Sequence, residues 1–163
     1  MVLRKRIYSD DKIHFVTFSV YRHIDVFTNK FIAEEFIQNL NFYFKKNKYK
    51  AYAYVVMPTH VHLLVKLSGS GSISDLIRDI KKFFSYKAKN LLSKMTEFDL
   101  KIFNNKGKYQ FWERGFDEVT IHSKRIFKIK LKYIMNNPVK AGLVERHENY
   151  PFLYVSEFDK MGV

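Results

Sequence analysis

Cysteine is absent from this chain of 163 residues, and glycine, proline and tryptophan are scarce, with six, three and one residues respectively. Without cysteine the protein has no disulfide bonds, no thiolate zinc site and no cysteine nucleophile. No run approaches the roughly 18 apolar residues of a membrane span, and the basic N-terminal sequence MVLRKRIYSDDK lacks the apolar segment of a signal peptide. We therefore expect no membrane association and a cytoplasmic location.

Internal repeats, low-complexity tracts and long charge blocks are also missing. The only stretch with the composition of a flexible loop is 68–72, SGSGS. The length suits one domain with a core of its own. The sequence therefore predicts a single domain over residues 1–163, with its core from about residue 12 to about residue 152.

Positive charge dominates the composition. Lysine and arginine total 29 against 16 aspartates and glutamates, which gives a formal net charge of +13. Such a surface attracts polyanions, of which nucleic acid is the commonest in a cytoplasm, although lysine-rich surfaces also serve solubility alone. The 16 phenylalanines and 11 tyrosines are able to stack on unpaired bases or to fill the core. Composition thus favours nucleic-acid binding and does not indicate a more specific function.

Hydrophobic periodicity predicts alternating strands and helices. Strands, with apolar residues at every second position, are expected at 13–21, 51–57, 60–67 and 116–121. Helices, with apolar residues three and four apart, are expected at 29–46, 73–92 and 123–136. Pro58 separates the second and third strands because proline cannot donate to a sheet ladder, and Pro138 is expected to end the last helix. The stretch 94–110 is expected to form an irregular surface loop.

This order, β-α-β-β-α-β followed by a helix, predicts an α+β fold. A central antiparallel sheet of ferredoxin-like topology, with the helices packed on one face, accounts for it. Phe31 and Phe83 belong to the apolar stripes of the first two helices and are expected to be buried.

His60 and His62 are two residues apart on one expected strand. Because side chains alternate across a strand, both imidazoles should lie on the same face while Val61 anchors the strand in the core. Two adjacent imidazoles are suited to hold a divalent metal ion. Two structural histidines would give the same pattern.

The last helix offers polar side chains on one face. Tyr133 and Asn137 are four residues apart, and Lys130 lies one turn earlier. Asn137 has an oxygen that could complete a metal site, but asparagine is also common at helix C-termini, and Tyr133 could sit at the edge of the core. Lys130 could steer a phosphate or lie in solvent. An opposite row is expected to pack on the sheet: Phe127, Leu131 and Ile134.

Two motifs resemble those of a known family. MPTHVHLLV around His60 and His62 is similar to the HUH motif of single-strand-DNA transposases. LKYIMNNPVKAGLV around Tyr133 resembles the tyrosine helix of REP-associated tyrosine transposases and their insertion-sequence relatives. FWERGFDEVTI and the pair Tyr150–Pro151 resemble the same group, so the similarity covers the chain from the first strand to about residue 152.

This resemblance implies a role for each matching residue. His60 and His62 correspond to the metal-binding pair, and Tyr133 corresponds to the nucleophile. Asn137 falls where relatives carry a third polar ligand, which is glutamine in many insertion-sequence members. The donor set of two histidines and an amide oxygen suits Mg²⁺ or Mn²⁺ better than Zn²⁺. The family fold is a ferredoxin-like sheet with the HUH strand in the centre.

The activity that the resemblance implies is cleavage and rejoining of single-stranded or hairpin DNA through a 5′-phosphotyrosine intermediate. Basic residues along the chain are candidates for DNA contact: Arg4, Lys5, Arg6, Lys81, Lys82, Lys87, Arg114 and Lys130. An inactive or domesticated relative that binds hairpin DNA without cutting it is the alternative. An RRM-like sheet that binds RNA is a third reading. The protein is expected to act as a monomer or a homodimer, and the sequence leaves both open.

Overall fold

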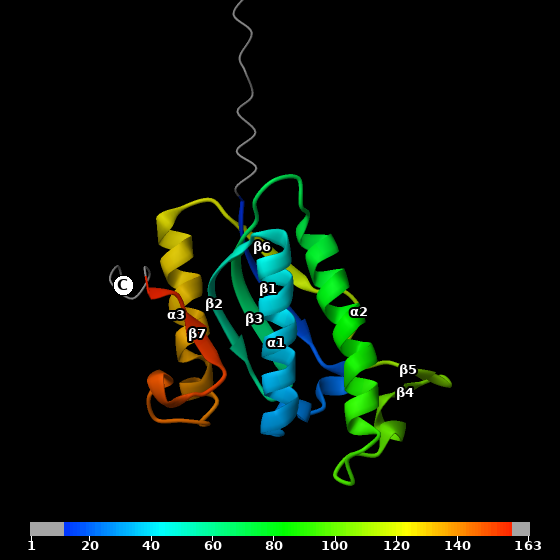
Figure 1. The fold of residues 1–163 in the computed structure, drawn as a ribbon. Coiled ribbons are helices and arrows are strands. Elements are labelled where there is room, and N and C mark those ends of the chain that lie inside the picture. The colour runs from blue at the N-terminus through cyan, green and yellow to red at the C-terminus, as the bar shows by residue number, and fades with distance from the viewer. Residues whose placement is uncertain (1–11, 158–163) are drawn as a thin grey trace, which may run out of the picture.

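Among the described residues, five strands form one antiparallel sheet in the order β6-β1-β3-β2-β7 (Figure 1). The computed structural model describes residues 12–157. The strands of the sheet are β1 (Ile13–Ser19), β2 (Lys50–Val56), β3 (His60–Lys66), β6 (Asp117–Ile121) and β7 (Leu153–Val155). The helices are α1 (Lys30–Asn47), α2 (Ile73–Leu92) and α3 (Lys124–Lys140). The expected α+β class, the strand order of a ferredoxin-like sheet and the break at Pro58 are confirmed.

The sheet is covered on both faces, which corrects the expectation that the helices share one face. Helices α1 and α2 lie side by side over one face (Figure 1), where Val61 and Leu63 of β3 join the larger core. Leu64 points the other way and packs with Leu131 and Ile134 of α3. The central strands are apolar on both faces and therefore need cover on both. Strand β3, which carries His60 and His62, lies in the middle of the sheet.

Aromatic rings fill the core between the sheet and the first two helices. Phe36 of α1 and Phe84 of α2 have ring centroids 4.8 Å apart, and Trp112 lies 5.1 Å from Phe18. Much of the aromatic excess is therefore core. Phe31 and Phe83 are exceptions, because 48% and 52% of their surfaces are exposed. The buried face of each helix is formed by residues next to these two phenylalanines in the sequence. The prediction that Phe31 and Phe83 are buried was therefore wrong.

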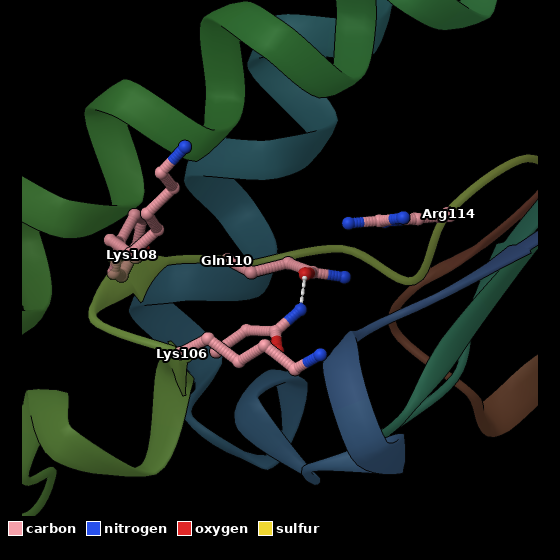
Figure 2. A pocket seen from close by; sticks show the side chains of 6 residues that line it. Lys106, Lys108, Gln110 and Arg114 are labelled. Atoms are coloured by element: carbon pink, nitrogen blue, oxygen red, sulfur yellow. Dashed lines mark hydrogen bonds between the residues drawn. The ribbon is translucent and has the colours of Figure 1, made fainter.

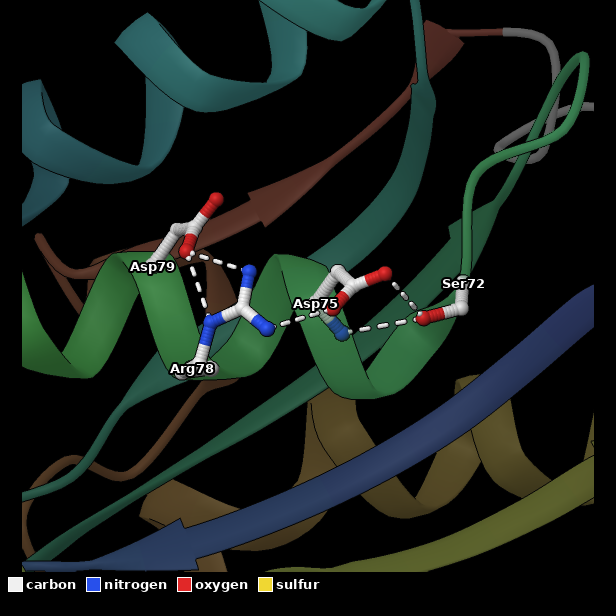
Figure 3. Close-up of polar contacts among 4 residues, drawn as sticks. All are labelled: Ser72, Asp75, Arg78 and Asp79. Atoms are coloured by element: carbon white, nitrogen blue, oxygen red, sulfur yellow. Dashed lines mark hydrogen bonds and ion pairs between the residues drawn. The ribbon is translucent and has the colours of Figure 1, made fainter.

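Polar side chains cap the three helices at the expected starts. The side chains of Asn29 and Ser123 accept hydrogen bonds from Ile32 N and Ile126 N at the starts of α1 and α3. Ser72 does the same for α2, accepting from Asp75 N at 3.1 Å. Figure 3 shows Arg78 between Asp75 and Asp79, with Nη1 2.6 Å from the Asp75 carboxylate. These caps satisfy backbone donors that have no partner inside the helix.

Helix α3 continues through Pro138 to Lys140, so the expected end before the proline was wrong. Proline forfeits one hydrogen bond, but here the last turn is closed by Ala141 N donating to Asn137 O and Leu143 N donating to Pro138 O, both at 3.0 Å. Pro138 is buried, and Gly142 adopts the left-handed conformation (φ 71°) that ends many helices. Asn137 therefore lies within the helix and is not its C-cap.

Two elements at the edges of the fold also differ from the predictions made from the sequence. The stretch 94–110 contains a 3-10 turn and a small hairpin of β4 (Asn104–Asn105) and β5 (Lys108–Tyr109), with Phe103 fully buried. It is thus a folded element and not an irregular loop. Strand β7, which pairs with β2, was not expected, because three residues are too few to show a pattern. Within residues 12–157 no helix is both long and apolar enough to span a membrane.

Candidate active site

His60 and His62 project from β3 toward the face covered by α3. Their ring centroids are 4.7 Å apart, which confirms that both imidazoles share one face of the sheet. His62 is 3% exposed, whereas His60 is partly exposed at the end of the strand. The pair therefore presents one enclosed ring and one accessible ring side by side.

Threonine hydroxyls contact the Nδ1 atom of each ring. Thr17 Oγ1 lies 2.7 Å from His62 Nδ1, and Thr59 Oγ1 lies 2.9 Å from His60 Nδ1. In the tautomer in which Nδ1–H donates to the hydroxyl, Nε2 keeps its lone pair. Contacts of this kind orient metal-binding histidines in other proteins. The sequence did not predict Thr17 as a site residue, because its position opposite His62 depends on the pairing register of β1 and β3.

Both imidazoles are held in the neutral form. Burial lowers the pKa of His62 to about 3, and the electrostatic effects of the neighbouring His60 and Lys130 lower it further. Burial also lowers the pKa of His60, assisted by His23. Neutral imidazole is the form that binds a metal ion, so both rings are ready to donate a lone pair near pH 7.

Helix α3 brings Tyr133 and Asn137 onto the same two rings. The Tyr133 ring centroid lies 5.1 Å from that of His62, and 41% of the tyrosine surface is exposed. Asn137 Nδ2 lies 3.3 Å from His62 Nε2. Because the amide oxygen and nitrogen exchange places when the amide rotates, Asn137 can present its oxygen there instead. The structure thus brings together four of the residues singled out in the sequence.

These side chains offer donors to a divalent cation. Within residues 12–157 no group of three or more His, Cys, Asp or Glu side chains is placed to hold a metal ion. An oxygen-bearing side chain next to His62 is the Asn137 amide. Two imidazole nitrogens and one amide oxygen are donors that a divalent cation can share with water.

Phe15 and Lys130 complete the surroundings of Tyr133. The Phe15 ring stacks on His62 at 5.7 Å and meets Tyr133 edge-on at 5.8 Å. Lys130 Nζ lies 4.5 Å from the Phe15 ring centroid and 5.9 Å from that of Tyr133. Lys130 is therefore a neighbour of Tyr133 and not an isolated solvent residue. The sequence did not predict that Phe15 lies at the site, because its place in the alternating pattern of the strand is that of any strand residue.

The other basic candidates are spread over the molecule. Three of them belong to α2, on the opposite face of the sheet from the histidines. Lys81 is engaged internally, with Nζ 2.8 Å from Glu113 O and 2.6 Å from Gly115 O, and Lys87 pairs with Glu35. Lys82 is exposed.

Arg114 is a basic candidate that shares a cavity with a residue bonded to one of the histidines. It lines a cavity of about 400 Å³ together with Thr17, which bonds His62. The remaining candidates Arg4, Lys5 and Arg6 fall outside the described residues.

Residues 7–137 match the family model described as transposase, IS200 like. The chain belongs to the IS200-like transposase family. Membership of this family indicates a DNA-cleaving enzyme, and members generally use a divalent metal. The resemblance noted in the two motifs is therefore confirmed at the level of the family.

Individual relatives agree with this assignment. The REP-associated tyrosine transposase of Escherichia coli K12 is 29% identical over 101 residues, which are 61% of this chain and 50% of that protein. The chain thus spans about half the length of this curated relative.

Two solved structures share the fold. A REP-associated tyrosine transposase bound to a REP hairpin has a TM-score of 0.69 at 22% identity, covering 94% of this chain and 82% of the other. A provisionally named transposase from Deinococcus radiodurans R1 has a TM-score of 0.56 at 18% identity, covering 83% and 97%.

Proposed function

We propose that this IS200-like transposase cleaves and rejoins single-stranded or hairpin DNA through a covalent link to Tyr133. The observation that carries the proposal is the position of the Tyr133 ring, 5.1 Å from His62, on the helix that also brings Asn137 to the same imidazole. A nucleophile next to a cation-binding group is the arrangement that phosphodiester cleavage requires.

His60, His62 and Asn137 are the proposed holders of Mg²⁺ or Mn²⁺. When bound, the cation would polarise the scissile phosphate and offset the charge that develops on its oxygens. Thr17 and Thr59 support this role because they fix the orientation of the two rings through Nδ1. Asn137 would supply an oxygen after its amide turns away from the present contact between Nδ2 and His62 Nε2.

Tyr133 is the proposed nucleophile. Its hydroxyl oxygen would form a bond to phosphorus while the bond to the 3′ oxygen breaks, leaving a 5′-phosphotyrosine and a free 3′-hydroxyl. Reversal of the same step with another 3′-hydroxyl rejoins DNA. The ammonium group of Lys130, 5.9 Å from the Tyr133 ring, favours the negative charge that develops on the attacking oxygen.

Hairpin DNA with a single-stranded flank is the proposed substrate. A structural relative is bound to a REP hairpin, and the net charge of +13 suits a polyanion. A single strand reaches the site more easily than a duplex does, because Tyr133 and the histidines meet between the sheet and α3.

A cleavage assay tests the proposal. Hairpin oligonucleotides labelled at the 3′ end are incubated with the protein and Mn²⁺ and analysed on a denaturing protein gel. We expect a labelled covalent adduct with wild type and with Tyr86→Phe, a control tyrosine that is 74% exposed on α2. Tyr133→Phe should form none. Hairpin binding without any adduct from the wild-type protein would instead support the binding-only alternative.

A further inference from the structure

The turn of the β4–β5 hairpin holds a lysine in a strained conformation. Lys106 and Gly107 have φ values of 51° and 83°, as in the two-residue type I′ turns that join short strands. Asparagine and glycine are the residues that such turns prefer, because a longer side chain is disfavoured at positive φ. Strained residues of this kind cluster at sites that hold ligands. The turn thus places a basic side chain where asparagine would be less strained.

Beside this turn lies a cavity of about 470 Å³ with a strongly basic lining. Its walls are formed by six residues, none of which is acidic: Asn105, Lys106, Lys108, Tyr109, Gln110 and Arg114. Figure 2 shows the ammonium group of Lys106, the Gln110 amide and the Arg114 guanidinium lying close to one another. Donors gathered without a carboxylate make a place for an anion.

The amide groups of this cavity are held in place by hydrogen bonds, in contrast to the charged groups of Lys106 and Arg114. Asn105 Nδ2 donates to Gln110 Oε1 at 2.6 Å, and Gln110 Nε2 donates to Trp112 O at 2.9 Å. Within residues 12–157 neither Lys106 nor Arg114 forms an ion pair with a carboxylate. Their charges are thus available to an external ligand on a rigid base.

Arg114 connects this cavity with the candidate active site. It also lines the cavity of about 400 Å³ that includes Thr17, Ser19 and His23 and, beside them, the carboxylates of Glu113 and Asp117. Thr17 bonds His62, and Ser19 is paired with His60 across the β1–β3 ladder. Arg114 is thus shared by the cavity at the hairpin turn and by the cavity that contains the hydroxyl partner of His62.

We propose that the cavity at the β4–β5 hairpin is a phosphodiester subsite, which holds the DNA single strand as it runs away from the active site. Lys106 and Arg114 each neutralise a backbone phosphate, and Gln110 donates to the same backbone. The direction of the strand rests on the proposed function, since it assumes that the strand enters at His60 and His62. The contacts carry no base specificity, because phosphate oxygens are alike in every sequence.

Fluorescence anisotropy with labelled dT20 tests the subsite. Affinity is measured at several salt concentrations in EDTA for wild type, Lys106→Asn, Arg114→Gln and the control Lys101→Asn, an exposed lysine of the neighbouring 3-10 turn. In Lys106→Asn and in Arg114→Gln, a plot of the logarithm of the association constant against the logarithm of the salt concentration should become less steep by about 0.7. This change corresponds to about a fivefold loss of affinity near 0.1 M salt. Lys101→Asn should match wild type.

Thermal unfolding and a blunt-ended hairpin separate this reading from others. Lys106→Asn should have a Tm no lower than wild type, because asparagine suits the turn. Three results would overturn the proposal. Lys106→Asn would bind dT20 as tightly as wild type, or Lys101→Asn would lose as much affinity as Lys106→Asn. Alternatively, Lys106→Asn would lose more affinity for the blunt hairpin than for dT20. No cleavage takes part in this binding assay. A protein that shows the expected losses but forms no adduct with DNA would therefore refute the proposed function alone.

Discussion

Replacing Thr17 with valine removes the hydroxyl that orients His62 while keeping the shape of the side chain. Thr17 Oγ1 lies 2.7 Å from His62 Nδ1, and His62 is only 3% exposed, so water cannot easily take the place of the hydroxyl. Leaving a buried polar atom without a partner costs about 1–3 kcal/mol. That cost applies to the fold with or without metal. Losing the group that orients a metal-binding histidine should lower Mn²⁺ affinity by about 10- to 100-fold.

Isothermal titration with Mn²⁺ measures this affinity, and thermal unfolding measures the cost to the fold. For a chain of this length, Tm should fall by about 2–4 °C per kcal/mol lost. Thr120→Val is the matched control, because its hydroxyl donates to Glu118 on β6 and not to a histidine. Equal Mn²⁺ affinity of Thr17→Val and wild type would refute the role of the threonine in fixing the metal-binding ring.

Three further predictions follow from the same structure. Burial lowers the pKa of His62 from 6.5 to about 3, so between these pH values the unfolded chain binds a proton that the folded chain does not. The free energy of unfolding, measured in urea, should therefore decrease as pH falls through this range. The decrease should be smaller in His62→Phe. Asn137→Ala should weaken Mn²⁺ binding by about tenfold or more, whereas Asn137→Gln should keep most of it; equal weakening by both would exclude an amide ligand. Lys81→Met should lower the free energy of unfolding by about 1–3 kcal/mol because two carbonyls lose their donor, and a loss of the same size in the exposed control Lys82→Met would contradict this.

The parts of the fold that depend on short-range pattern could be predicted from the sequence. The period-two alternation of β3 placed His60 and His62 on one face, and Pro58 marked the break between two strands. The spacing of Tyr133 and Asn137 placed both on the side of α3 that meets His62. These features depend on periods of two and 3.6 residues, which are visible in any chain.

The features that depend on tertiary packing could not be predicted. Helix α3 covers the second face of the sheet, and the side on which a helix packs is not encoded in its own stripe. Thr17 reached the site through the β1–β3 register, which no local pattern reveals. Pro138 stayed inside α3 because backbone donors from beyond the helix close its last turn. Lys81 satisfies two backbone carbonyls that are far away in the sequence.

The identity of the residue that becomes linked to DNA tests the central claim most directly. The adduct formed with hairpin DNA and Mn²⁺ is digested with protease and nuclease, and the peptide that retains a nucleotide is sequenced by mass spectrometry. The account predicts a 5′-phosphonucleotide on Tyr133, in the peptide that contains the sequence LKYIMNNP. A nucleotide on any other side chain, or cleaved DNA with no linked peptide, would contradict it.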